Sequence, residues 1–158
     1  MKKMRLLLLL PILFWIAVQF LNYRSHPAAM LGATDGMLAE CPASPNAVCS
    51  QSESDQHAIP PFSYAPNTPA TAWPALRKAV GDIPRVTIVE ETDVYLRGEC
   101  RTLLMRYVDD IEFLHVPVES LIHIRSASRI GYSDLDANRK RMEQVRLALQ
   151  RQIDEEAN

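Results

Sequence analysis

Basic and hydroxyl side chains are concentrated between Arg125 and Arg141, where a predicted strand leads into the last predicted helix. The first turn of a helix has unpaired N–H groups and the positive end of the helix dipole, so cations placed there require an anion from the protein or from a ligand. We therefore predict a binding site for a carboxylate or a phosphate at this junction. The candidate ligand-binding residues are Arg129, Asn138, Arg139, Arg141, Ser128 and Asn46.

A second interpretation gives the same arginines a structural role. Asp109 and Asp110 stand at the start of a predicted strand, and their carboxylates can pair with Arg129, Arg139 and Arg141 to fix the last helix to the sheet. The sequence does not decide between the ligand-binding and the structural interpretation.

Asn138 lies on the predicted inward face of the last helix. A buried amide without partners costs about 1 to 3 kcal/mol, so we expect it to bond with the loop at 125–133 or with the Cys41–Asn46 segment.

A hydrolase is the alternative function. His123 with Asp110 or Ser128 is the candidate pair, because a histidine beside a carboxylate or a hydroxyl can transfer protons. The serines do not stand in the G-x-S-x-G turn that exposes a nucleophile, so no catalytic residue is assigned and the question of enzyme activity stays open. A scaffold without any ligand is the third hypothesis.

Composition argues against other classes of ligand. The net charge of -2, with mixed signs, gives no basic field for nucleic acid. His57, His115 and His123 are scattered over dissimilar segments, so we expect neither a metal nor another cofactor.

The N-terminus has the order of an export signal. Lys2, Lys3 and Arg5 precede an apolar run from Leu6 to Leu21. Small residues suited to cleavage occur only well beyond this run, so an uncleaved signal anchor over residues 1–23 is favoured over a removed peptide. The charge asymmetry predicts a single-pass protein of the bacterial inner membrane with its C-terminal domain in the periplasm. The membrane is thus a predicted partner, beside an anionic small molecule, a lipid headgroup or an envelope protein.

Residues 24–69 are predicted to form a linker that becomes an ordered arm, since they are rich in proline and lack a sustained period. Cys41 and Cys49 are close enough to close a small disulfide loop in an oxidising compartment, or all three cysteines are free. Cys100 would stay unpaired in either case.

Residues 70–158 are predicted to form an α+β domain of order αββββα, with two helices on one face of a four-stranded antiparallel sheet and the 40–69 arm packed on it. The expected helix spans Thr71 to Val80, and the second begins at a Ser133 cap. Period-two alternation predicts strands at 86–91, 94–101, 108–116 and 121–126. The last helix is expected to bury an apolar stripe made of Leu135, Met142, Val145, Leu149 and Ile153.

The same alternation predicts one apolar and one charged sheet face. We expect the charged face to be self-paired and solvated, or else to dock a charged partner. Its members are Arg97, Glu99, Arg101, Asp110, Glu112, His123 and Arg125.

Four stretches of the chain form a recognisable combination: Cys41–Asn46, Pro84-Arg85, Tyr107–Phe113, and Ile122–Asp134 with Asn138–Arg141. Together they resemble the bacterial and plastid family called domain of unknown function 1499 (DUF1499). The resemblance spans residues 40–149 and implies a small exported or envelope-associated domain without an established activity. Family members carry a second cysteine directly after the Asn of the first stretch, whereas this chain has Ala47 there and Cys49 two residues on. The resemblance therefore does not assign the cysteine pairing.

Overall fold

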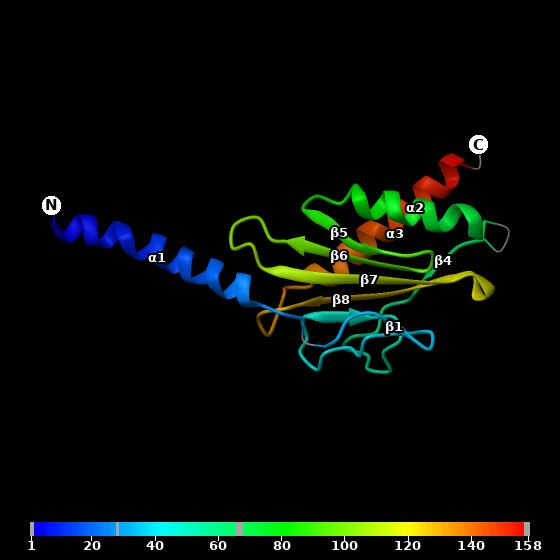
Figure 1. Ribbon diagram of the computed structural model, residues 1–158, viewed down its shortest axis with the longest axis horizontal. Helices are drawn as coiled ribbons and strands as arrows, with labels where there is room; N and C mark the ends of the chain where they lie inside the picture. Colours follow the sequence, from blue (N-terminus) through cyan, green and yellow to red (C-terminus); the bar gives the residue numbers. More distant parts are fainter. Residues whose placement is uncertain (1, 28, 66–67, 157–158) are drawn as a thin grey trace.

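The structure, a computed structural model, describes residues 2–27, 29–65 and 68–156. A few residues of the predicted anchor, linker and α+β domain lie outside these ranges, namely residues 1, 28, 66, 67, 157 and 158. A long N-terminal helix leads into a domain in which two helices lie on one side of a sheet (Figure 1). The elements are α1 (Lys2–Arg24), β1 (Ala33–Thr34), β2 (Met37–Leu38), β3 (Ala47–Cys49), β4 (Phe62–Ser63), α2 (Pro69–Gly81), β5 (Val86–Glu91), β6 (Tyr95–Arg101), β7 (Val108–Val116), a 3-10 turn η1 (Pro117–Glu119), β8 (Leu121–Ser128) and α3 (Ala137–Glu156).

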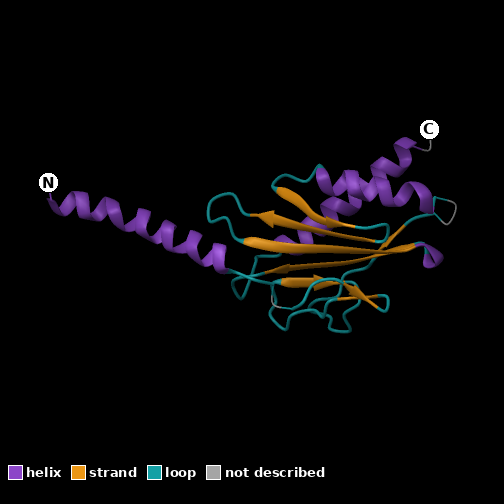
Figure 2. Ribbon diagram, in the orientation of Figure 1, coloured by secondary structure: helices purple, strands orange, loops and turns teal. Residues whose placement is uncertain are grey.

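The main sheet of the described chain is antiparallel and has six strands instead of the predicted four. Its order is β3-β8-β7-β6-β5, with β4 also paired to β8. Figure 2 shows the long strands of this sheet side by side. The two additional strands come from the proline-rich arm: Ala47 pairs with Ala127 and Phe62 with Ile122. The arm thereby covers the edge of β8, whose backbone groups would otherwise lack partners.

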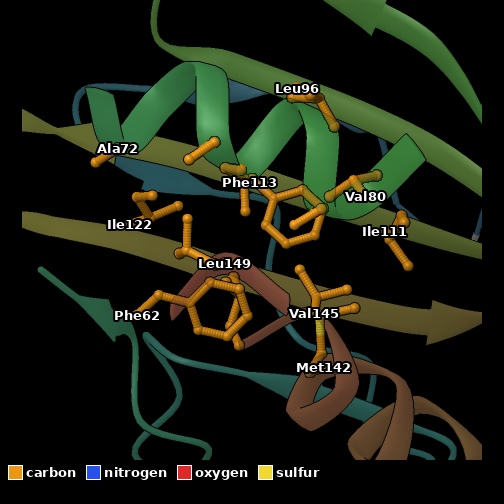
Figure 3. Close-up of a cluster of buried hydrophobic side chains, with 14 of the residues drawn as sticks. Phe62, Ala72, Val80, Leu96, Ile111, Phe113, Ile122, Met142, Val145 and Leu149 are labelled. Carbon is orange, nitrogen blue, oxygen red and sulfur yellow. The ribbon is translucent and has the colours of Figure 1, made fainter. Parts of the chain in front are cut away.

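The core lies between the sheet and the two helices α2 and α3 (Figure 3). Strand alternation brings Leu96, Phe113 and Ile122 to this side of the sheet, and the helices meet them with their apolar faces. Labelled core residues include Phe62, Ala72, Val80, Ile111, Met142, Val145 and Leu149. Phe62 shows that the arm also contributes to the core.

The start of α3 differs from the prediction. The helix begins at Ala137, and the Asp134 side chain, not Ser133, accepts a hydrogen bond from the Asn138 N–H at 2.7 Å. Leu135 and Asp136 have left-handed φ values of 56° and 62°, which places them in a turn before the helix. The Leu135 side chain is therefore 83% exposed and does not belong to the apolar stripe, as we had expected.

The charged sheet face is self-paired, as predicted, but its centre is not solvated. Arg125, Glu112 and Asp110 are buried. The segment between α1 and β3 reaches this face: the Gly32 N–H donates to Glu112 Oε1, and Arg125 Nε donates to the Glu40 carbonyl oxygen. The prediction of a solvated face is wrong at the centre of the sheet, because the arm replaces water as the hydrogen-bond partner of these side chains.

Helix α1 projects from the domain and contacts it through its last turns (Figure 1). Trp15 Nε1 donates to the Leu104 carbonyl oxygen at 3.2 Å, and Asn22 Nδ2 donates to that of Met105 at 2.6 Å. In the part of the chain that the structure describes, no helix combines the length and the hydropathy needed to cross a membrane.

Candidate functional site

The predicted site residues are divided between the two faces of the sheet. On β8, Ser126 and Ser128 point to the same side as the core isoleucines, whereas Arg125 points to the other side, because strand side chains alternate. Ser128 stands opposite Asp109, and the following residue, Arg129, reaches Asp110 on the far face. The sheet itself therefore separates Arg129 from Arg141.

Asn138 is the centre of the network on the helix side. Its Nδ2 donates to the Asn46 carbonyl oxygen at 2.8 Å and to Ser128 Oγ at 3.0 Å. Its Oδ1 accepts from Ser126 Oγ at 2.5 Å and from Arg141 Nη1 at 2.7 Å. The amide joins the arm, β8 and α3, which are the segments that the sequence analysis expected it to join.

Arg141 completes this network with a buried ion pair. Its Nη2 lies 2.6 Å from Asp109 Oδ2. Cys100 stands opposite Asp109 on β6 and is a buried free thiol, whose pKa is raised by burial. Because the ion pair is shielded from water, removal of one partner would leave an uncompensated buried charge.

Arg129 is paired on the other face. Its Nε and Nη2 bond to both oxygens of Asp110 at 2.8 and 2.7 Å, and Nη2 also contacts Glu99 at 2.5 Å. The hydrogen bond with Asp110 is the main cause that raises the pKa of Arg129. Burial raises the pKa of Glu99, but the hydrogen bonds and charges of Arg129 and Arg101 together outweigh burial and lower it overall. The guanidinium charge is thus neutralised within the protein.

Glu112 and Arg125 form a second ion pair on this face, 2.8 Å apart. The Tyr95 hydroxyl donates to the remaining oxygen of Glu112 at 2.7 Å. Burial, followed by the nearby Glu112 charge, raises the pKa of Tyr95. The carboxylates of Glu99, Asp110 and Glu112 thus accept hydrogen bonds from partners within the protein.

The remaining two candidates hold the arm. Arg139 donates to the carbonyl oxygens of Ala58 and Gln56 at 2.9 and 3.4 Å, so the predicted pairing with Asp109 or Asp110 is wrong for this residue. Asn46 Nδ2 donates to the Gly131 carbonyl oxygen at 2.7 Å.

The hydrolase pairings are not formed. Asp110 stands opposite Ala127, four residues from His123 along β8, or about 13 Å at strand spacing. Ser128 is an odd number of residues away and points to the opposite face. His123 instead contacts Ser50, with Nδ1 3.2 Å from Oγ, and this oxygen also accepts the Ile124 N–H.

Cys41 and Cys49 form a disulfide, and both line a hollow of about 630 Å³ with Arg125 at its side. Among the described residues, no group of three or more His, Cys, Asp or Glu side chains is arranged to hold a metal ion.

A larger groove of about 680 Å³ runs along α3 beside the turn between α2 and β5, and we call it the α3 groove. Of the predicted site residues it includes only Arg141. The sequence analysis missed the others, although part of the set is visible in the sequence of α3. Lys140, Gln144 and Arg151 are four and seven residues apart, which places them on one face of the helix. The groove is lined by Asp82, Ile83, Pro84, Arg85, Cys100, Ala137, Lys140, Arg141, Gln144, Leu147, Ala148, Arg151, Gln152 and Glu155.

Fold and site define a two-layer α+β domain whose polar residues are mostly used to join its own segments. Residues 37–149 match the family described as "Protein of unknown function (DUF1499)". The chain therefore belongs to the DUF1499 family, which confirms the resemblance seen in the sequence. No curated protein and no solved structure matches the chain.

Proposed function

We propose that the protein is a membrane-tethered, non-enzymatic module that binds an anionic ligand in the α3 groove. The supporting observation is a set of three cations at the groove, Arg85, Lys140 and Arg151. Their hydrogen bonds, as far as the described residues show, go to backbone carbonyl oxygens of Arg101, Leu135 and Leu147. A carbonyl oxygen accepts a hydrogen bond but does not neutralise a positive charge as a carboxylate does.

The other arginines of the predicted site make the contrast clear. Arg129 and Arg141 are held by aspartates within the protein, so a ligand would have to displace a paired carboxylate. Arg85, Lys140 and Arg151 can offer their charge without that cost. The groove has two acidic residues among its lining side chains. Asp82 pairs with Lys78, and the other is Glu155, in the last turn of α3.

The conformation of Arg85 supports the same site. Its φ of 64° lies in the left-handed region, which is uncommon for a residue with a Cβ, and such strain is concentrated at functional positions. Apolar side chains of Ile83, Leu147 and Ala148 line the same groove as the cations. The ligand class that fits is a phosphate or carboxylate joined to a short apolar group.

A tether to the membrane is the second part of the proposal. It is supported by the cationic start and the apolar run of the N-terminal segment. The Cys41–Cys49 disulfide is typical of oxidising compartments and supports a periplasmic domain of a bacterial inner-membrane protein.

The test uses the full chain in lipid nanodiscs and octyl phosphate as the probe, with binding followed by NMR chemical shifts. We expect shifts in the α3 groove that saturate, and none with octylammonium, which has the same alkyl chain and the opposite charge. Lys140→Glu and Arg151→Glu should each weaken binding about tenfold, since a reversed charge repels the anion.

Arg77→Glu is the matched control. Arg77 lies on α2, is exposed and undergoes the same change of charge, but it does not line the groove. Equal loss of binding in all three variants, or equal binding of octylammonium, would refute the groove as the site.

A scaffold is the second candidate function, favoured by the internal pairing of Arg129 and Asn138. It predicts that octyl phosphate does not bind.

A further inference from the structure

The hairpin that joins β6 to β7 lies against α1 (Figure 1). Three α1 side chains meet it with their polar groups: Trp15 donates to the Leu104 carbonyl oxygen, and Gln19 and Asn22 donate to that of Met105. These contacts lie on one face of α1, as their spacing along the helix requires. The polar groups of this face are therefore directed at the hairpin.

The tip of the same hairpin is apolar and uncovered. Leu103 and Leu104 are 70% and 74% exposed. Adjacent exposed leucines are unusual on a soluble surface unless they form part of a binding site. Helix α1, which contacts this hairpin, also exposes apolar side chains, namely Leu10, Ile12, Leu13, Phe14, Ile16, Phe20 and Leu21.

We propose that the β6–β7 tip is a second membrane contact, in which Leu103 and Leu104 enter the boundary between headgroups and acyl chains of a bilayer beside α1. This inference rests on the membrane tether of the proposed function. It adds to that tether a specific surface of the folded domain.

Satisfied backbone groups make such entry feasible. A carbonyl oxygen that enters a region poor in water needs a hydrogen-bond donor. The side chains of α1 supply donors to the carbonyls of Leu104 and Met105. Within the hairpin, the Thr102 N–H donates to the Tyr107 carbonyl oxygen, and the Tyr107 N–H donates to Thr102 Oγ1.

Charge at the edges of this surface fits anionic lipid. Arg106 is exposed in the tip and Arg24 is exposed in the last turn of α1. Among the described residues, neither forms an ion pair with a carboxylate; Arg24 lies over the Phe20 ring at 5.8 Å. Basic side chains next to an apolar surface are attracted by anionic headgroups within about a Debye length.

The test places single tryptophans in the full chain, reconstituted in vesicles of phosphatidylglycerol and brominated phosphatidylcholine. The background carries Trp73→Phe and Trp15→Gln, because bromine on the acyl chains quenches tryptophan that reaches them. Trp15→Gln removes the indole but keeps an N–H donor at this position of α1, which faces the Leu104 carbonyl oxygen. Leu104→Trp should lose about half of its emission when the bromines lie near the headgroups, and less when they lie at the chain ends.

Val118→Trp is the control, because Val118 is also an exposed apolar residue, 92% accessible, but lies in η1 at the other end of β7. It should not be quenched. A Trp73→Phe variant that keeps Trp15 reports on α1 separately. Quenching of Trp15 without quenching of the Leu104→Trp variant would overturn the second contact and leave the tether intact. Absence of quenching at both positions would overturn the second contact and the tether together. Association of the protein into dimers through Leu103 and Leu104, without quenching, would assign the surface to a second copy and also overturn the inference.

Discussion

Asp109 and Asp110 are consecutive in the chain but neutralise arginines on opposite faces of the sheet. Asp109 pairs with Arg141 of α3, and Asp110 pairs with Arg129. The two-residue period of β7 makes this division, since neighbouring side chains on a strand point in opposite directions. One acidic pair thus fixes a helix on one side and the end of β8 on the other.

Asp109→Asn should destabilise the protein more than Asp110→Asn. The first change leaves the buried Arg141 without a carboxylate and should cost about 3 to 5 kcal/mol. The second leaves Arg129 with Glu99, so we expect a cost of about 1.5 to 3 kcal/mol. Urea unfolding measures both, with Asp82→Asn as an exposed control. A larger loss for Asp110→Asn would contradict this assignment.

Asn138→Asp should weaken the junction between the arm, β8 and α3. A carboxylate cannot donate to the Asn46 carbonyl oxygen, which keeps the N–H of Ser128 as its donor. The buried carboxylate oxygen that replaces the amide nitrogen would instead face this acceptor without a hydrogen bond, at a cost of about 1 to 3 kcal/mol. The free energy of unfolding should fall by this amount. Gln144→Glu, the same chemical change on the groove side of α3, should have little effect; equal effects would show that Asn138 is not a structural centre.

His115 should make stability depend on pH. Burial lowers the pKa of this residue, and its Nε2 lies 2.7 Å from the Tyr64 hydroxyl. The unfolded chain then binds a proton more readily than the folded protein. The stability that neutral His115 contributes is therefore complete above the pKa of the unfolded chain and is lost as pH falls towards the lowered pKa of the folded protein. Wild type should lose more stability from neutral to mildly acid pH than His115→Gln. His26→Gln, at an exposed position, should behave like wild type; parallel curves for all three proteins would rule out this role.

The Cys41–Cys49 disulfide should contribute about 2.5 kcal/mol in the chain-entropy account, because it closes a short loop. Unfolding of the Cys41→Ser, Cys49→Ser double variant should show this loss, and dithiothreitol should not change it further. Cys100→Ser is the control and should keep the response to the reductant. If the double variant is as stable as wild type, the loop is held by other contacts.

Sequence periodicity was sufficient for the long strands. The bounds predicted for β5 and β7 are confirmed, and the helices fall within a few residues of their predicted places. Strands β3 and β4 were missed because two or three residues are too few to show alternation. Their pairing depends on β8, which lies far away in the sequence.

The candidate site was less predictable for a different reason. Of the two interpretations of the arginines near α3, pairing with aspartates is confirmed for Arg129 and Arg141 and wrong for Arg139. The sequence analysis also treated Arg129 and Arg141 as one cluster. Extending the β8 alternation to Ser128 would have separated them. The α3 groove depends on Arg85, which comes from a turn before β5, and nothing in a single sequence indicates that this turn lies beside α3.

The pairing of β3 and β4 with β8 also determines an order of assembly. An emerging chain presents residues 47–63 long before residues 121–128, so the early strands have no partner until almost all of the protein is available. Contacts between such distant segments close large loops and slow folding. A nascent or truncated chain that lacks β8 would leave these segments exposed, which makes the arrival of the C-terminal part the event that completes the sheet.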